Sequence, residues 1–483
     1  MNWKVITWYV GISLLMVAAL MSVAAIIAYA TPGDESLFPL VYSAILTVTV
    51  GVFPLIFVQR GKHHLSFKEG NSIVVGAWLC GCIFGMLPFL FYGHEFTLVN
   101  ALFESVSGFT TTGASILQDI ESLPRGLQFW RIATAWVGGI GIVTLFSMLM
   151  SGSSNRTTLS GAEISSVARD AFSGVRTGSF TTRMLVTYIA LTVVTFFSLK
   201  LTGMPWFDAA TNAMSACSTC GFCVRNDSIA FYANPAAEVV LTLAMLASGI
   251  NFGLLFLAFI KRRPRHIMKS ETVKAFLGAV LVCIGIITAD LLLNGGYPSW
   301  VAALRDASFQ VASIATTTGF ATKDTTLWPP MSMAVILICS LICGCSGSTS
   351  GGIKMDRALL AWKGISRKVS MTVTPNLVKP IRVDGQIRQD DCVNDAFSYI
   401  FCYLLVLVIF AAINIAGGQD FTTGVTASVA CIGNVGPGFG EVGSMNNYAD
   451  FSGLLKVSSM LEMLIGRLEI FPVLYLLRTI RKQ

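Results

Sequence analysis

Charged side chains are scarce in this sequence. Only 12% of its 483 residues are charged, whereas a soluble protein carries about 25%. Hydrophobic residues make up 54% of the chain, and there are only four histidines, all in polar connections or at the ends of apolar runs. The composition excludes an ordinary soluble protein and indicates a polytopic membrane protein. The histidine distribution argues against a membrane-embedded Ser/His or metal–histidine site.

The chain also lacks a recognisable zinc site. Most of its twelve cysteines lie in apolar runs, where a small buried thiol is the ordinary interpretation. Cys220 and Cys223 have C-x-x-C spacing, but no second pair of ligands is near them in the sequence. We therefore expect no metal centre and no resident cofactor.

Long hydrophobic runs predict ten membrane spans. The first run is longer than the roughly 7–15 apolar residues of a signal peptide, so it is interpreted as a retained span. Lys and Arg cluster after the second, fourth, sixth and eighth spans and at the C-terminus, which predicts cytoplasmic termini. The predicted spans are 5–30, 38–58, 72–93, 130–150, 184–203, 236–260, 274–294, 331–363, 396–416 and 453–478.

One short motif recurs four times. Its glycines are Gly113, Gly221, Gly319 and Gly436, which are 108, 98 and 117 residues apart. Recurrence at a spacing near one hundred indicates four copies of one unit. Each copy follows a short stretch of mixed polarity that cannot cross the roughly 30 Å hydrocarbon core, and a full span follows it. All four motifs fall on the outer side of the predicted topology.

The predicted fold is an all-α polytopic membrane protein with four pseudo-symmetric helix–pore-loop–helix repeats around one pore. Two additional N-terminal transmembrane helices precede the repeats. The predicted units are 1–60 for the additional helices, and 70–155, 183–265, 272–365 and 392–480 for repeats 1 to 4.

The motifs have the chemistry of a cation filter. Non-helical backbone at membrane depth survives only where protein buries it or where it lines a water-filled path. Glycine permits positive φ, so successive carbonyl groups can face one axis, and rings of carbonyls replace the hydration shell of K⁺ in potassium filters. A single such motif would be interpreted as an ordinary re-entrant turn. Four equivalent copies on one side favour the filter.

The eighth span contains a predicted break. Residues 331–363 would form a helix about 50 Å long, which exceeds the membrane core. Its middle, residues 344–352, is rich in Gly and Ser, which disfavour helix. A polar segment there could block an ion path and move aside. The alternative is a simple kink or a misplaced loop.

Arg467 and Glu469 interrupt the apolar tenth span. A charge in the membrane usually faces a cavity or a partner. Arg467 either faces the pore as a barrier below the filter or extends to the cytoplasmic edge, and the sequence leaves both interpretations open.

Several of these segments together resemble the Trk/Ktr/HKT superfamily of potassium transporters, most closely the bacterial TrkH-type pore subunit. The similarity covers nearly the whole chain. It depends on residues 110–115, on residues 218–223, on the C-S-G-S-T-S-G-G-I-K segment at 345–354, and on residues 434–440 followed by 466–472. The cytoplasmic segment 375–380 is also similar to that of the family.

The resemblance implies specific site residues. The carbonyls of eight residues would bind K⁺, namely Thr111, Thr112, Thr219, Cys220, Thr317, Thr318, Asn434 and Val435, next to the glycines Gly113, Gly221, Gly319 and Gly436. Glycine in all four copies is typical of K⁺ preference in this superfamily. The gate would comprise Gly344, Ser346, Gly347, Ser348, Gly351, Gly352 and Lys354, with Arg467 beside it. Cys220 and Cys223 replace the small residues that are commonest in the second motif.

The resemblance also implies a homodimer in the bacterial inner membrane, a cytosolic nucleotide-binding (RCK-type) regulatory subunit, and K⁺ as the transported ion. No nucleic acid partner is expected. An ion-coupled potassium symporter remains an alternative, because coupling cannot be inferred from these motifs. An intramembrane enzyme would need buried catalytic groups that the sequence does not provide, and a receptor or scaffold would leave the four motifs unexplained.

Overall fold

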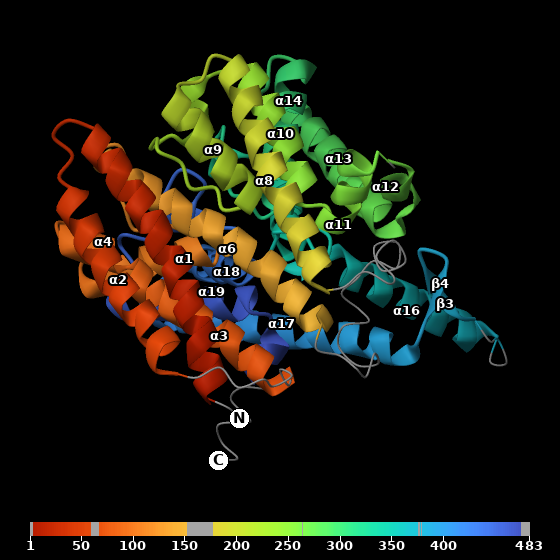
Figure 1. The fold of residues 1–483 in the computed structure, drawn as a ribbon. Coiled ribbons are helices and arrows are strands. Elements are labelled where there is room, and N and C mark those ends of the chain that lie inside the picture. Colours follow the sequence, from red (N-terminus) through yellow and green to blue (C-terminus); the bar gives the residue numbers. More distant parts are fainter. Residues whose placement is uncertain are drawn as a thin grey trace.

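The computed structural model describes residues 3–58, 67–151, 177–262, 264–374, 377 and 379–474, and it is almost entirely helical (Figure 1). Of the predicted features, half of the segment 375–380, namely residues 375, 376 and 378, lies outside the described residues. The helices are α1 (Trp3–Ala30), α2 (Leu37–Phe57), α3 (Phe67–Gly85), α4 (Leu87–Tyr92), α5 (Leu98–Phe109), α6 (Arg125–Ser151), α8 (Thr177–Leu201), α9 (Trp206–Ser218), α10 (Pro235–Ser248), α11 (Phe252–Leu255), α12 (Arg265–Lys269), α13 (Glu271–Leu293), α14 (Trp300–Ala315), α15 (Pro330–Leu341), α16 (Met355–Val373), α17 (Asp390–Ala416), α18 (Phe421–Gly433) and α19 (Gly453–Arg467).

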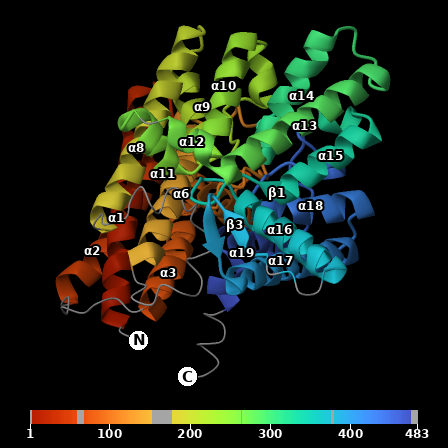
Figure 2. The ribbon, with the colours of Figure 1, turned by 90° about the vertical axis from the view of Figure 1, so that its right-hand side faces the viewer.

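Four units with the same order of structural elements follow one another around the molecule. Each has a first span, a short pore helix, a non-helical filter segment and a second span. The pore helices are α5, α9, α14 and α18, and each ends three or four residues before its motif glycine. In Figure 2 the chain proceeds around the molecule from α3 and α6, through α8 to α10 and α13 to α15, to α17 to α19. The predicted fold class is confirmed.

The two N-terminal helices form an addition to the first repeat. Helix α1 packs against α2, α3 and α6. Gly11 and Gly51 lie where α1 and α2 cross, and a Cβ on Gly11 would come 2.6 Å from the Gly51 carbonyl oxygen. These glycines therefore allow the two backbones to approach closely, as small residues do between membrane helices.

Two predicted spans are not continuous helices. The predicted span 236–260 is bent, because α10 ends at Ser248 and the chain bends by 110° before it resumes at Phe252. The predicted span 453–478 is interrupted, because α19 ends at Arg467 and Glu469 has φ +65°. Both breaks lie beside the predicted gate.

Six helices within the described residues are long and apolar enough to cross a membrane, and the bent pair that begins at Pro235 makes seven. These six run from Trp3 to Ala30, Leu37 to Phe57, Glu69 to Tyr92, Thr182 to Leu201, Glu271 to Leu293 and Asp390 to Ala416. The eighth predicted span is two helices, α15 and α16, with a loop between them, as its Gly/Ser content predicted.

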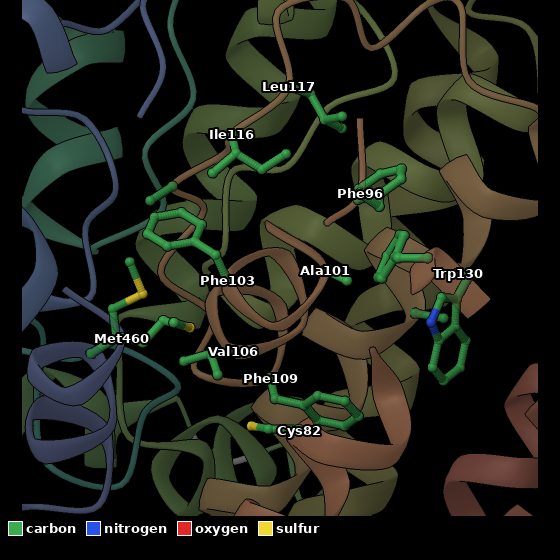
Figure 3. Close-up of a cluster of buried hydrophobic side chains, with 14 of the residues drawn as sticks. Cys82, Phe96, Ala101, Phe103, Val106, Phe109, Ile116, Leu117, Trp130 and Met460 are labelled. Atoms are coloured by element: carbon green, nitrogen blue, oxygen red, sulfur yellow. The ribbon is translucent and has the colours of Figure 1, made fainter. Parts of the chain in front are cut away.

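The first pore helix is fixed by an apolar cluster on its outer side. Phe103, Val106 and Phe109 of α5 pack among side chains from α3, α6 and α19, which include Cys82, Trp130 and Met460 (Figure 3). The Trp130 indole also donates a hydrogen bond of 3.0 Å to the Gly85 carbonyl. This packing orients the C-terminal end of α5 towards the centre of the molecule.

Four short strands complete the structure. Strands β1 (Ile342–Cys343) and β2 (Ile353–Lys354) pair in parallel and close the loop between α15 and α16. Strands β3 (Ile381–Val383) and β4 (Gln386–Arg388) form an antiparallel hairpin next to α16 (Figures 1 and 2). Asp384 accepts a 2.6 Å hydrogen bond from the Glu271 amide, so this hairpin caps the start of α13.

Candidate functional site

Each pore helix ends in the same unusual turn. The residue two positions before each filter glycine has a left-handed backbone, with φ +52° at Thr111, +57° at Thr219, +57° at Thr317 and +52° at Asn434. The following amide donates to the carbonyl five residues earlier, for example from Thr112 to Ser107 at 2.9 Å. The same bond joins Cys220 to Ser215, Thr318 to Ser313 and Val435 to Ala430 at 2.8–3.1 Å.

This hydrogen-bond pattern is that of a Schellman motif, which satisfies the last carbonyls of a helix and normally has glycine at the left-handed position. A β-branched residue there is strained. Three of the four filters nevertheless have threonine at this position, and the fourth has asparagine, which tolerates the conformation better. The surrounding structure must therefore hold this backbone in place.

The four filter segments enclose one axis. A Cβ on Gly113 would overlap the carbonyl oxygen of Cys220. The same relation holds from Gly221 to Thr318, from Gly319 to Val435, and from Gly436 back to Thr112. Each filter glycine thus lies against a carbonyl of the next repeat, in the order 1, 2, 3, 4 and back to 1. We call this closed set of four contacts the carbonyl–glycine ring.

The ring brings together all twelve predicted filter residues. The carbonyl oxygens of Thr112, Cys220, Thr318 and Val435 form one layer of the ring, and the glycines have positive φ between +81° and +92°. The eight non-glycine residues are completely buried. The peptide oxygen of Cys220 occupies the same place as its counterparts, so the cysteine does not alter the backbone at this position.

An outer vestibule adjoins the ring. It is a cavity of about 170 Å³ that contacts all four filter glycines and is lined by the segments that follow them. Its lining includes Arg131, Cys223 and Tyr448. A path therefore leads from the protein surface to the ring.

A loop of residues 344–352, the inner loop, lies on the other side of the ring. All of its residues are buried. The Gly351 amide donates to Thr317 Oγ1 at 3.0 Å, and Thr349 Oγ1 donates to the Cys217 carbonyl at 3.1 Å. A Cβ on Gly351 would overlap the Gly433 carbonyl at the end of α18. The inner loop therefore contacts the ends of three pore helices directly beneath the filter.

Arg467 fixes the inner loop from the fourth repeat. Its side chain is 2% exposed, and Nη1 donates to the Thr349 carbonyl at 2.7 Å. Nη2 also reaches the Gly138 carbonyl of α6 at 3.5 Å. The guanidinium therefore lies inside the protein next to the loop, and the alternative of an arginine that extends to the membrane edge does not match this geometry.

A second set of charges holds the end of the loop. Glu469 lies 3.3 Å from Lys354 Nζ and 2.7 Å from Arg357. Arg357 in turn stacks over the Tyr399 ring, with 3.7 Å between the guanidinium carbon and the ring centroid. The break after Arg467 thus places Arg467 beside Thr349 of the loop and Glu469 beside the residues that follow the loop.

Two residues that hold the inner loop were missed from the sequence. Asn251 caps α11 with Oδ1 and donates from Nδ2 to the Ser346 carbonyl at 2.7 Å. Asp356, which is 6% exposed, accepts a 2.6 Å hydrogen bond from the Ser346 amide. An Asn two residues after Gly249 in an apolar run was a possible signal of a helix break with a cap. Asp356 had no comparable signal.

Comparisons with known proteins agree with this architecture. The family described as "TrkH: Cation transport protein" matches residues 40–282 and 297–483. The chain belongs to the TrkH family. The Trk system potassium uptake protein TrkH of Salmonella typhimurium is 33% identical over 421 residues, which are 86% of each chain. TrkG of Escherichia coli is 29% identical over 448 residues, or 92% of this chain and 91% of TrkG.

The fold is also that of a solved TrkH-family structure. The crystal structure of the potassium transporter TrkH from Vibrio parahaemolyticus superimposes with a TM-score of 0.90, covers 99% of both chains and is 30% identical in sequence. The chain is therefore a multi-pass membrane protein of this family. Among the described residues, no group of three or more His, Cys, Asp or Glu side chains is placed to hold a metal ion.

Proposed function

We propose that this chain takes up potassium ions across the bacterial inner membrane, with K⁺ bound by the carbonyl–glycine ring. The observation that carries the proposal is the closed order of the four contacts, because a ring of carbonyls can replace the hydration shell of a cation. Four pore helices direct their C-terminal, negative dipole ends towards the same region, which favours a cation. The relatives named as potassium uptake proteins support the choice of ion.

We further propose that the inner loop is the gate. It lies beneath the filter, and backbone groups account for most of its hydrogen bonds to the rest of the protein. Opening then requires the loop to leave Thr317, Cys217 and Arg467. Such a loop is a two-state element that a regulator can bias.

A homodimer and a cytosolic nucleotide-binding subunit complete the proposal. The docking surface for that subunit would be the basic connection 363–388, which contains β3, β4 and part of α16. The hairpin contacts the start of α13 through Asp384, and α16 begins directly after the inner loop. A displacement of this connection by the bound subunit can therefore be transmitted to the gate through α13 and α16. Both termini are proposed to be cytoplasmic.

Rubidium uptake into liposomes that contain the purified protein tests the proposal. We expect uptake that K⁺ inhibits and Na⁺ inhibits weakly. Replacement of residues 344–352 by nine glycines should raise uptake, because the side chains that hold the closed loop, such as Thr349, are lost while the link between the parallel strands β1 and β2 keeps its length.

If neither the wild-type protein nor the loop variant takes up Rb⁺, the proposed function is contradicted. Uptake that needs an imposed Na⁺ or H⁺ gradient would replace it with ion-coupled symport.

A further inference from the structure

The pore helices share one more equivalent position, nine residues before each filter glycine. It is Glu104 in repeat 1, Asn212 in repeat 2, Gln310 in repeat 3 and Ala427 in repeat 4. We use the term exit segments for the four residues that follow each filter glycine. Asn212 Oδ1 accepts from Cys223 Sγ at 3.5 Å, and Gln310 Nε2 donates to the Lys323 carbonyl at 3.0 Å. This position therefore holds the exit segment of its own repeat.

In repeat 4, a neighbouring residue contacts the exit segment. Ala427 has no polar group, but Thr426 Oγ1 donates to the Phe439 carbonyl at 3.1 Å and accepts from the Phe439 amide at 2.9 Å. At this position and its neighbour Thr426, repeats 2, 3 and 4 thus contact their own exit segments with neutral side chains.

Repeat 1 uses a charge instead. Glu104 is completely buried, and its carboxylate accepts from Ser115 Oγ at 3.1 Å and from the Ile116 amide at 3.2 Å. It also forms an ion pair with Arg131, whose side chain is 3% exposed. A buried carboxylate needs such a partner, since a charge taken out of water is costly when it is unpaired.

Arg131 extends the contact to the next repeat. Its Nη1 donates to the Cys223 carbonyl at 3.1 Å, and its guanidinium carbon lies 3.6 Å from the centroid of the Phe222 ring. Both residues belong to the exit segment of repeat 2. The pair therefore joins two exit segments at the point where Gly113 lies against the Cys220 carbonyl.

We propose that Glu104 and Arg131 are positioning residues that set the discrimination between K⁺ and Na⁺ in the outer part of the filter. This inference rests on the proposed function. Selectivity depends on the number and arrangement of the carbonyls around the ion, and the pair fixes two of the four segments that carry them. Arg131 also lines the outer vestibule, where its charge is compensated by Glu104.

The test compares Rb⁺ uptake against Na⁺ competition in wild type, Glu104→Gln and the double variant Glu104→Gln/Arg131→Gln. We expect both variants to lose selectivity by about fivefold, within the range by which residues outside a binding site modulate it. Glu104→Gln should also slow uptake, because it leaves an unpaired cation at the vestibule. The double variant should recover the uptake rate but remain unselective. If the pair acted only through its charge, removal of both charges would restore the selectivity as well.

Glu238→Gln is the matched control. Glu238 is paired with Arg305 through two hydrogen bonds of 2.6 Å between α10 and α14, and within the described part of the chain neither side chain is hydrogen-bonded to an exit segment. It should keep wild-type selectivity.

Arg131→Lys is a second variant that should still fold, because a lysine retains the positive charge opposite Glu104. Lysine cannot contact both Glu104 and Cys223, since it lacks the rigid guanidinium fork. We expect about a twofold loss of selectivity in this variant. Wild-type selectivity in Arg131→Lys, or in a double variant that elutes and melts as wild type does, would overturn the inference. A wild-type protein without K⁺ flux would overturn the proposed function instead.

Discussion

At the residue scale, the filter combines two kinds of left-handed residue. The four glycines were evident from the sequence, because their motif recurs at a spacing near one hundred. In the structure, a Cβ on any of them would overlap a carbonyl oxygen of the next repeat. The left-handed residues two positions earlier could not be predicted. Local propensity opposes this conformation for Thr111, Thr219 and Thr317, and only the Schellman bonds and burial in the assembled pore impose it.

Gly113→Ser separates steric overlap from backbone strain. The serine Cβ would overlap the Cys220 carbonyl, so we expect most of the preference for K⁺ over Na⁺ to be lost. Gly33→Ser is the control, because Gly33 has nearly the same φ, +78° against +81°, but open space around it. Both substitutions should cost about 1–2 kcal/mol of stability for the left-handed backbone.

The measurement is Rb⁺ uptake with competing Na⁺, together with the melting temperature in detergent. Equal losses of selectivity in Gly113→Ser and Gly33→Ser would show that strain, and not the ring contact, is responsible.

At the element scale, the helix breaks differ in how visible they are in the sequence. The break between α15 and α16 was predicted, because nine residues rich in Gly and Ser cannot continue a helix. The break after α10 was missed. Only Gly249 and Asn251 mark it, and the bend is stabilised by a tertiary bond of 2.8 Å from the Cys345 amide to the Gly249 carbonyl.

The β3–β4 hairpin was also missed, although Asp384-Gly385 between two short extended runs is a typical hairpin turn. Both residues have positive φ, as that turn requires. The surrounding basic residues were interpreted only as topology-setting charge or a docking surface. The turn at Asp384-Gly385 was therefore not recognised among these basic residues.

Asn251→Ala tests the role of the α10 break in gating. The variant loses a helix cap and the hydrogen bond to the Ser346 carbonyl, so the closed loop should be less stable. One hydrogen bond contributes about 1 kcal/mol, which corresponds to roughly a fivefold rise in uptake without a regulator.

Asn234→Ala is the matched control. Asn234 caps α10 by accepting from the Ala236 and Ala237 amides, and its Nδ2 donates to Thr202 far from the inner loop. Each variant should lose about 1 kcal/mol of stability from its cap. A similar uptake in both variants would argue against a gating role for Asn251.

At the scale of the whole molecule, the number of repeats followed from the sequence, because the motif recurs four times. The cyclic order of the carbonyl–glycine ring did not, because motif spacing contains no information about which repeats are neighbours. The buried pair of Glu104 and Arg131 was missed for the same reason. These residues are 27 positions apart and meet only when α5 and α6 pack.

The basic connection gives a prediction for assembly with a regulatory subunit. Lys363, Arg367 and Arg388 contact other parts of the chain or are buried, whereas Lys368, Lys379 and Arg382 are exposed. Glutamine at the three exposed positions should reduce co-purification of the subunit about tenfold, a loss of about 1.4 kcal/mol in binding.

Lys261, Arg265 and Lys269 provide a control with the same change in charge, since they are exposed in and before α12. Glutamine at these three positions should leave co-purification unchanged. Undiminished co-purification of the first variant would assign the basic connection to topology alone.

The closed ring has a consequence for how the protein is made. Gly436 lies against the Thr112 carbonyl, so the last contact joins residues 324 positions apart. A ribosome must finish nearly the entire chain before this contact can form. Until then, the filter segment of repeat 4 is missing, and the segments of the first three repeats cannot surround an ion completely. A partly synthesised chain therefore has no complete ring of carbonyls, and the pore can be assembled only after the fourth repeat is made.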